Sequence, residues 1–284
     1  MFQKVLSKMW VLLFVTTVLV SQSQAQAKLQ FKQWVDPTES AFSLDVPVGW
    51  KISGGIKRAS DTRSEIMMQS PDGQIIVKIG DVNIPLSFVE LNQTLASLGY
   101  REGQMASSTL QIRNYLSGTQ FAAAYIQSAV AGRCSNVQLV NKNDRSDYVQ
   151  ALSQRGLIPS FATAYTAGEV IITCQSNGQK YIGYAFAETY KVNYQGTGTA
   201  WSLKALYAFM APANLGAVGD AVAQKGLATL QQNIQWAMGE RQFDQKAFED
   251  YKKYRKYSSY LQEQMTDDRM DLMDKIAEQR RDVL

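Results

Sequence analysis

Residues 162–212 decide the fold: they read ATAYTAGEVIITC (162–174), GQKYIGYAFAETYKV (178–192) and TAWSLKALYAFMAP (199–212). The three runs are rich in β-branched and aromatic residues, which favour extended strands. Asn177-Gly178 separates the first two runs, and Gly196 and Gly198 separate the last two. Asn-Gly is a preferred pair for a tight hairpin turn. The sequence therefore predicts three antiparallel strands that follow one another as a meander.

The flanking segments add further strands and several helices. Short β-type runs predict strands at 31–35 (FKQWV), 41–47 (AFSLDVP), 49–54 (GWKISG), 64–70 (SEIMMQS), 74–80 (QIIVKIG), 109–116 (TLQIRNYL) and 134–141 (CSNVQLVN). Ser70-Pro71-Asp72-Gly73 predicts a hairpin turn. Apolar residues at helical spacing predict helices at 87–98, 118–132, 144–156 (capped by Asp144) and 214–238. Together these patterns predict an α+β fold in which helices cover antiparallel sheets.

The composition changes after residue 238. From Arg241 to Leu284 the chain has no Gly, Pro or Cys, and its apolar residues alternate at spacings of three and four. This pattern predicts a long helix with a narrow apolar seam. We therefore divide the chain into a segment at 1–27, two α+β halves at 28–132 and 133–238, and a charged C-terminal helix at 239–284. The two halves form either one continuous domain or two similar domains that meet near residue 133.

The N-terminus has the pattern of a signal peptide. Lys4 and Lys8 precede a run of 12 mostly apolar residues, Met9 to Val20, and Ala25-Gln26-Ala27 follows. The run is too short to span a bilayer but has the length of a secretory h-region. We expect cleavage after Ala27, or after Ala25, and export to a bacterial periplasm or the medium.

The two cysteines are predicted to form a disulfide. Cys134 opens one predicted strand, Cys174 closes another, and an exported protein meets an oxidising compartment. Two separate buried thiols are the alternative. The spacing matches neither a redox Cys-x-x-Cys motif nor a zinc site.

The composition excludes several classes of function. The chain contains no histidine, the commonest general base and transition-metal ligand. Removal of Lys4 and Lys8 leaves a formal charge of only +2, which is too small to support nucleic-acid binding unless the charge is unevenly distributed. No Ser-x-x-Lys, Gly-x-Ser-x-Gly or phosphate-loop motif occurs after the signal segment. We identify no cofactor, no metal site and no catalytic residue.

The predicted C-terminal helix holds the candidate partner-binding residues. A basic cluster lies among tyrosines, and the apolar seam continues beyond it; the candidates are Tyr251, Lys252, Lys253, Tyr254, Arg255, Lys256, Leu261, Met265, Leu272 and Ile276. Five carboxylates share another face: Glu263, Asp267, Asp271, Asp274 and Glu278. A solvated helix, self-association, binding of a protein partner and a hard-cation site are the alternative interpretations of this charge pattern.

The opening of the mature chain resembles a known family. AFSLDVPVGW (41–50), with QSPDGQIIV (69–77) downstream, resembles the start of PsbP and Mog1-type domains, and also that of uncharacterised exported bacterial proteins. The resemblance covers Ala41 to Gly80. It implies an α/β/α sandwich around an antiparallel sheet, with Pro47 and Gly49 setting a turn and Trp50 entering the core. It also implies a binding or accessory role rather than an enzymatic one, and it assigns no functional residue.

These observations favour an exported, non-enzymatic binding or accessory protein. Its expected target is a protein partner or an envelope component, met through a sheet face or the terminal helix. The alternative is a secreted hydrolase that uses scattered carboxylates or a Ser/Lys pair. A third possibility is weak docking on an anionic membrane through Lys252 to Lys256.

Overall fold

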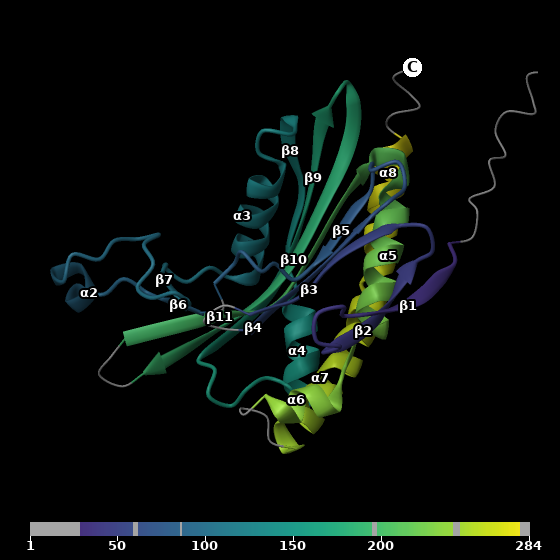
Figure 1. Ribbon diagram of the computed structural model, residues 1–284. Helices are drawn as coiled ribbons and strands as arrows, with labels where there is room; N and C mark the ends of the chain where they lie inside the picture. Colours follow the sequence, from purple (N-terminus) through teal and green to yellow (C-terminus); the bar gives the residue numbers. More distant parts are fainter. Residues whose placement is uncertain (1–28, 59–61, 86, 195–197, 241–244, 279–284) are drawn as a thin grey trace, which may run out of the picture. The chain divides into compact units, whose positions relative to one another are not determined.

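The predicted meander lies at the centre of a large sheet (Figure 1). Strands β9 (Ala164–Ser176), β10 (Gln179–Tyr194) and β11 (Gly198–Pro212) pair antiparallel in chain order, which confirms the prediction. Asn177 and Gly178 connect β9 to β10 with φ values of 50° and 75°. A two-residue hairpin turn of type I′ requires a positive φ at both of its central residues.

The computed structural model describes residues 29–58, 62–85, 87–194, 198–240 and 245–278, without the side chains of 245–248, 250 and 251. Lys32–Leu284 forms one compact unit, separate from Met1–Phe31. The predicted signal peptide at 1–27 lies outside the described residues.

Strands from both predicted halves share the large sheet. Its order is β3-β4-β5-β11-β10-β9-β8, with β6 on β11 and β7 on β6. The added strands are β3 (Lys51–Arg58), β4 (Thr62–Gln69), β5 (Ile76–Ile79), β6 (Ser87–Val89), β7 (Leu110–Ile112) and β8 (Ser135–Asp144). The predicted hairpin at Ser70–Gly73 is confirmed, because β4 and β5 pair antiparallel. Because β5 of the first half pairs with β11 of the second, residues 28–132 and 133–238 have a continuous core.

A small second sheet lies beside the first. It contains β1 (Phe31–Val35), β2 (Phe42–Pro47) and β12 (Gln231–Gln232). The buried carboxylate of Asp36 joins the two sheets, because it accepts hydrogen bonds from backbone N–H groups of its own turn and from that of Ile56 on β3. Gly55 has a φ of +128°, and a Cβ there would collide with Asp36. Glycine at this position therefore allows the two sheets to approach closely.

Helices cover both faces of the large sheet (Figure 1). On one face α3 (Gly118–Val130) packs on β9 and β10. Trp201 stacks on Phe88 there, with ring centroids 4.0 Å apart. The other face is covered by α4 (Ser146–Gln154), α5 (Gly216–Thr229), α7 (Gln245–Gln264) and α8 (Thr266–Glu278). The α+β fold with helix-covered antiparallel sheets is thus confirmed, and no helix in the described ranges is long and apolar enough to cross a membrane.

The disulfide prediction is confirmed. Cys134 and Cys174 are bonded, with their Cα atoms 5.7 Å apart. The bridge ties the turn after α3 to the end of β9. With a sequence separation of 40 between the two cysteines, the chain-entropy account gives a stabilisation of about 4 kcal/mol.

Two predicted helices are partly wrong. In the segment 87–98, Ser87–Val89 is a strand, because Phe88 is buried against Trp201, and α2 (Gln93–Ser97) begins only after the Asn92 cap. The segment 214–238 is broken: after α5, Gln231–Gln232 pairs with β2, and Asn233 caps a separate helix, α6 (Ile234–Gly239).

Three smaller expectations also need correction. Asp144 does not cap α4, because it is the last residue of β8 and accepts a hydrogen bond from Thr119. The long C-terminal helix exists as α7 and α8, which are separated by a turn at Met265. Trp50 is half-buried rather than fully in the core, although Gly49 forms the expected turn with a φ of 83°.

Candidate binding cavity

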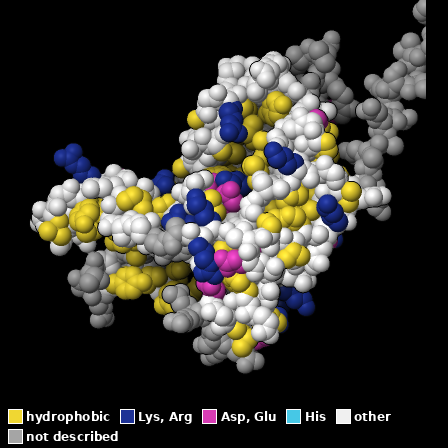
Figure 2. Space-filling model, viewed as in Figure 1, with side chains coloured by type: hydrophobic (Ala, Val, Ile, Leu, Met, Phe, Trp, Pro, Cys, Tyr) yellow, Lys and Arg dark blue, Asp and Glu magenta, His cyan; other side chains and the backbone are white. Residues whose placement is uncertain are grey.

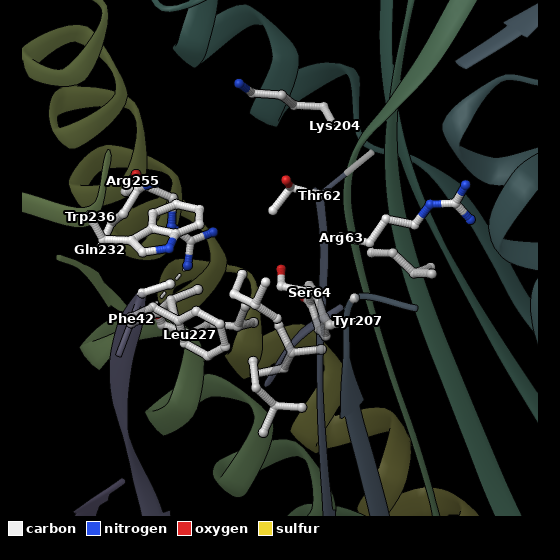
Figure 3. Close-up of a pocket in the computed structure, with 18 of the residues that line it drawn as sticks. Phe42, Thr62, Arg63, Ser64, Lys204, Tyr207, Leu227, Gln232, Trp236 and Arg255 are labelled. Atoms are coloured by element: carbon white, nitrogen blue, oxygen red, sulfur yellow. Dashed lines mark hydrogen bonds between the residues drawn. The ribbon is translucent and has the colours of Figure 1, made fainter. Parts of the chain in front are cut away.

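A cavity of about 260 Å³ lies between the two sheets and the helices α5, α6 and α7 (Figure 3). Pockets that hold small molecules are of about 300–1,000 Å³, so this cavity suits a small ligand. Its walls combine residues that are far apart in the sequence: Ala41, Phe42, Ile56, Thr62, Arg63, Ser64, Ile66, Ile79, Gly80, Lys204, Ala205, Leu206, Tyr207, Leu227, Leu230, Gln232, Trp236, Arg255 and Gln262.

Much of the wall is apolar and firmly packed. Phe42, Ile66 and Leu227 are buried side chains from β2, β4 and α5. Trp236 of α6 is held in place because its indole N–H donates to Glu39 at 2.6 Å. An apolar, preformed wall of this kind favours the apolar part of a ligand, since burial removes that part from water.

The charged residues of the wall are all basic. They are Arg63, Lys204 and Arg255, and none of the described lining residues is Asp or Glu. Arg63 points away from the cavity in Figure 3, and it donates to the carbonyl oxygens of Val82 and Ile84, each at 3.0 Å. Lys204 and Arg255 are the other two basic residues that line the cavity.

Lys204 lines the cavity and is exposed to solvent. Its ammonium lies 4.6 Å from the ring centre of Tyr254. Desolvation lowers the pKa of Lys204; the nearby Glu188 carboxylate opposes this shift, and Arg255 adds to it. An anion in the cavity would relieve both the desolvation and the repulsion from Arg255.

Two polar atoms of the wall have no hydrogen-bond partner in the described chain. They are the buried Nε of Arg255 and the buried Oε1 of Gln232. Arg255 also donates from Nη2 to the Leu227 carbonyl at 3.3 Å, which fixes the guanidinium beside the cavity. Buried polar groups are normally satisfied, so an unsatisfied donor and acceptor in one wall indicate that a polar ligand atom or water binds there.

A buried polar cluster attaches α7 to the sheet next to Lys204. The Glu188 carboxylate accepts hydrogen bonds from the hydroxyls of Tyr148 (2.7 Å), Tyr165 (2.5 Å) and Tyr254 (2.5 Å). Desolvation and the Glu188 charge raise the pKa of Tyr148 and of Tyr254 well above their usual value. These hydroxyls therefore stay protonated as donors, and the cluster has a structural role at the edge of the cavity.

The structure divides the predicted partner-binding residues into two groups. Tyr254, Leu261, Met265 and Ile276 are buried in the body of the chain and Leu272 is half-buried. Lys252, Lys253 and Lys256 are exposed, and Arg255 lies half-buried in the cavity wall. The side chain of Tyr251 lies outside the described residues. The five carboxylates from Glu263 to Glu278 are all exposed.

Lys204, Gln232 and the Glu188 cluster were missed from the sequence. A signal existed for two of them, because Lys204 and Glu188 are single charged residues inside otherwise apolar strands, in SLKALY and AFAETY. No sequence signal pointed to Gln232, because it lies in the segment that we assigned to a helix.

The cavity can hold a small organic anion, with the charged group near Lys204 and Arg255 and an apolar body against Phe42, Ile66 and Leu227. Comparison with known protein families and with curated proteins finds no family and no protein that matches this chain.

Proposed function

We propose that this protein is an exported, non-enzymatic binding protein whose ligand is a small organic anion with an apolar body. The observation that carries the proposal is the composition of the cavity wall. Lys204 and Arg255 line it together with apolar side chains, and no described lining residue is acidic. A purely apolar ligand would leave the unsatisfied polar atoms of Arg255 and Gln232 without a partner, and a cationic ligand would be repelled by Lys204 and Arg255. A monocarboxylate with a hydrocarbon chain fits both parts of the wall.

Export is supported by two features. The first is the basic, apolar and Ala-x-Ala pattern of residues 1–27. The second is the disulfide between Cys134 and Cys174, a bond that persists in oxidising compartments. A ligand held by such a protein would come from the cell envelope or the medium.

Calorimetric titration with fatty carboxylates of increasing length tests the binding function. Each buried CH2 contributes about 0.8 kcal/mol, so the affinity should rise roughly fourfold per carbon from hexanoate to octanoate and stop rising once the cavity is full. Octylamine should not bind and octanol should bind weakly. Equal affinity for octanoate and octylamine would exclude the proposed ligand class.

Two variants connect this binding to the cavity. Lys204→Met should weaken octanoate binding about tenfold or more, and Ser64→Phe should block it by filling space beside β4. Lys142→Met removes an exposed lysine of β8 that does not line the cavity, and it should leave the affinity unchanged. If Lys142→Met and Lys204→Met behave alike, the binding site lies elsewhere.

The hydrolase alternative has one supporting observation: Ser64 and Lys204 line the same cavity. In Figure 3, however, the Lys204 amine points away from the Ser64 hydroxyl, whereas a Ser/Lys catalyst needs them in hydrogen-bond reach. Hydrolysis of a p-nitrophenyl ester of octanoate that disappears in Ser64→Ala would favour the enzyme. Binding of octanoate without such turnover favours the binding protein.

A further inference from the structure

A basic groove runs along the outer side of the same cavity. It lies between α7 and the segment from α5 to α6, and its volume is about 570 Å³. We call it the basic groove; its described lining residues are Ala228, Leu230, Gln231, Gln232, Ile234, Glu249, Lys252, Lys253, Arg255, Lys256 and Ser259. Four are basic and one, Glu249, is acidic.

The excess of basic over acidic side chains is a local feature of the basic groove. Near the middle of the face shown in Figure 2, acidic side chains lie beside Lys and Arg side chains. Elsewhere in the chain Arg58 is ion-paired with Glu39 and with Glu240. In the basic groove, the described lining has four basic side chains and one acidic side chain, Glu249, which pairs with Lys252 at 3.3 Å. The groove is therefore complementary to an anionic surface.

Large apolar side chains are exposed on the same two helices. Ile234 (45% exposed) and Met238 (57%) lie one helical turn apart on α6, and Tyr260 (49%) lies one turn after Lys256 on α7. Lysines beside exposed aliphatic and tyrosine side chains are typical of surfaces that rest in the headgroup region of a bilayer. Recognition of an acidic protein would need only the lysines and would give the exposed apolar side chains no role.

The groove and the cavity adjoin each other. Leu230, Gln232 and Arg255 line both. Arg255 thus belongs to the wall of the groove and to the wall of the cavity. Organic anions with an apolar chain partition into membranes, so a cavity that adjoins a membrane-docking surface is placed where its ligand is concentrated.

The geometry points to a docking surface for an anionic lipid membrane, formed by Ile234, Met238, Lys252, Lys253, Lys256 and Tyr260, that sets the cavity against the lipid from which it takes its ligand. This inference rests on the proposed function. The lysines supply electrostatic attraction, Ile234 and Met238 enter the headgroup region, and the shared wall at Arg255 places the cavity next to the docked face.

Flotation of the mature protein with lipid vesicles tests the inference. Vesicles of phosphatidylcholine with phosphatidylglycerol should bind the protein, and vesicles of phosphatidylcholine alone should not. Lysines near an anionic surface strengthen binding by roughly fivefold each, so replacing Lys252, Lys253 and Lys256 with Gln should weaken it about 100-fold. Binding should also fall at high salt.

Two matched variants separate charge from apolar insertion. Replacing Lys51, Lys57 and Lys142 with Gln removes the same charge from exposed lysines outside the groove and should weaken vesicle binding far less. Ile234→Ser with Met238→Ser should weaken vesicle binding but leave capture on an acidic polyglutamate peptide unchanged. If the peptide binds as strongly as the vesicles and the Ile234/Met238 variant keeps full vesicle binding, the groove recognises an acidic protein and the inference is overturned.

Octanoate titration in solution tests the ligand-binding function separately from the docking surface. The variant at Lys252, Lys253 and Lys256 should still bind octanoate, because Lys204 and Arg255 remain. Octanoate binding without vesicle binding overturns the docking surface and leaves the proposed function intact. If octanoate also fails to bind, the cavity has another role and both proposals fall.

Discussion

At the scale of single residues, this protein depends on polar side chains placed inside an apolar sheet. Glu188 is fully buried, yet three tyrosine hydroxyls satisfy its carboxylate. Such a network is stable only when its members are all satisfied, because an unpaired buried polar group costs more than a hydrogen bond contributes. Glu188 therefore fixes the positions of Tyr148 on α4 and Tyr254 on α7.

Removing one hydroxyl from this network should be measurable. Tyr254→Phe keeps the ring but deletes a donor to Glu188, and we expect the free energy of unfolding to fall by about 1.5–3 kcal/mol in urea denaturation. Tyr257→Phe, on the same helix and only half-buried, should change it by less than about 0.5 kcal/mol. Equal effects of the two variants would argue against the Glu188 network.

Lys204 should make ligand binding depend on pH. Because desolvation lowers its pKa, Lys204 loses its charge below the ~10.4 of an ordinary lysine, and octanoate affinity should fall as the pH rises through that lowered pKa. Lys204→Arg should keep its affinity to higher pH. In the absence of ligand the unfolded chain holds this proton more tightly, so this group makes the free energy of unfolding rise with pH across the same window. Affinity that stays constant up to pH 10 in the unmodified protein would contradict the assignment.

At the scale of elements, α8 is fixed by one buried arginine. Arg269 is ion-paired with Glu169 on β9 and with Asp220 on α5, each at 3.3 Å, and it lies 5.0 Å from the ring centre of Tyr184. Desolvation raises the pKa of Asp220, and the Arg269 charge opposes that shift. Arg269 thus joins α8 to the sheet and to α5.

Breaking this connection should destabilise the fold strongly. Arg269→Met leaves Glu169 and Asp220 buried with less compensation, and we expect a loss of about 3–5 kcal/mol in the free energy of unfolding. Adding Asp220→Asn should recover part of that loss, since it removes one of the buried charges. Lys275→Met, at an exposed position of α8, serves as the control and should be nearly neutral. No recovery in the double variant would show that Asp220 is not coupled to Arg269.

The sequence predicted elements best where local chemistry decides them. Asn177-Gly178 and Ser70-Pro71-Asp72-Gly73 predicted their hairpins, and β-branched runs predicted β9 to β11. The sequence-based predictions were wrong where a partner that is distant in the sequence overrides the local pattern. Phe88 has helical spacing but is a strand residue because of Trp201, and Gln231 leaves the helix because β2 offers backbone partners.

At the scale of the whole molecule, the cavity could not be predicted from the sequence. Its wall combines Phe42, Ser64, Lys204, Gln232 and Arg255, which no local spacing connects. They meet only because β4 and β11 lie in one sheet, β12 pairs with β2, and α7 packs back on the body. The basic cluster at Lys252 to Lys256 was visible in the sequence, but its position beside a cavity was not.

The body should not persist without its last two helices. Truncation after Met238 uncovers the face that holds Tyr148, Tyr184 and Glu188, and it removes Arg255 from the cavity. We expect loss of the cooperative thermal transition, and binding of a dye that detects exposed apolar surface. A truncated chain that melts at the temperature of the full chain would show that α7 and α8 are an appendage.

The order in which the polypeptide is synthesised gives the packing of α7 and α8 a further consequence. While residues beyond about 240 are still inside the ribosome, the nascent chain has its meander but lacks the side chains of Tyr254 and Arg269, which close the sheet. Tight folding is therefore disfavoured until α7 and α8 have left the ribosome. A secretion channel that accepts only unfolded polypeptides would receive such a chain before the chain had folded stably.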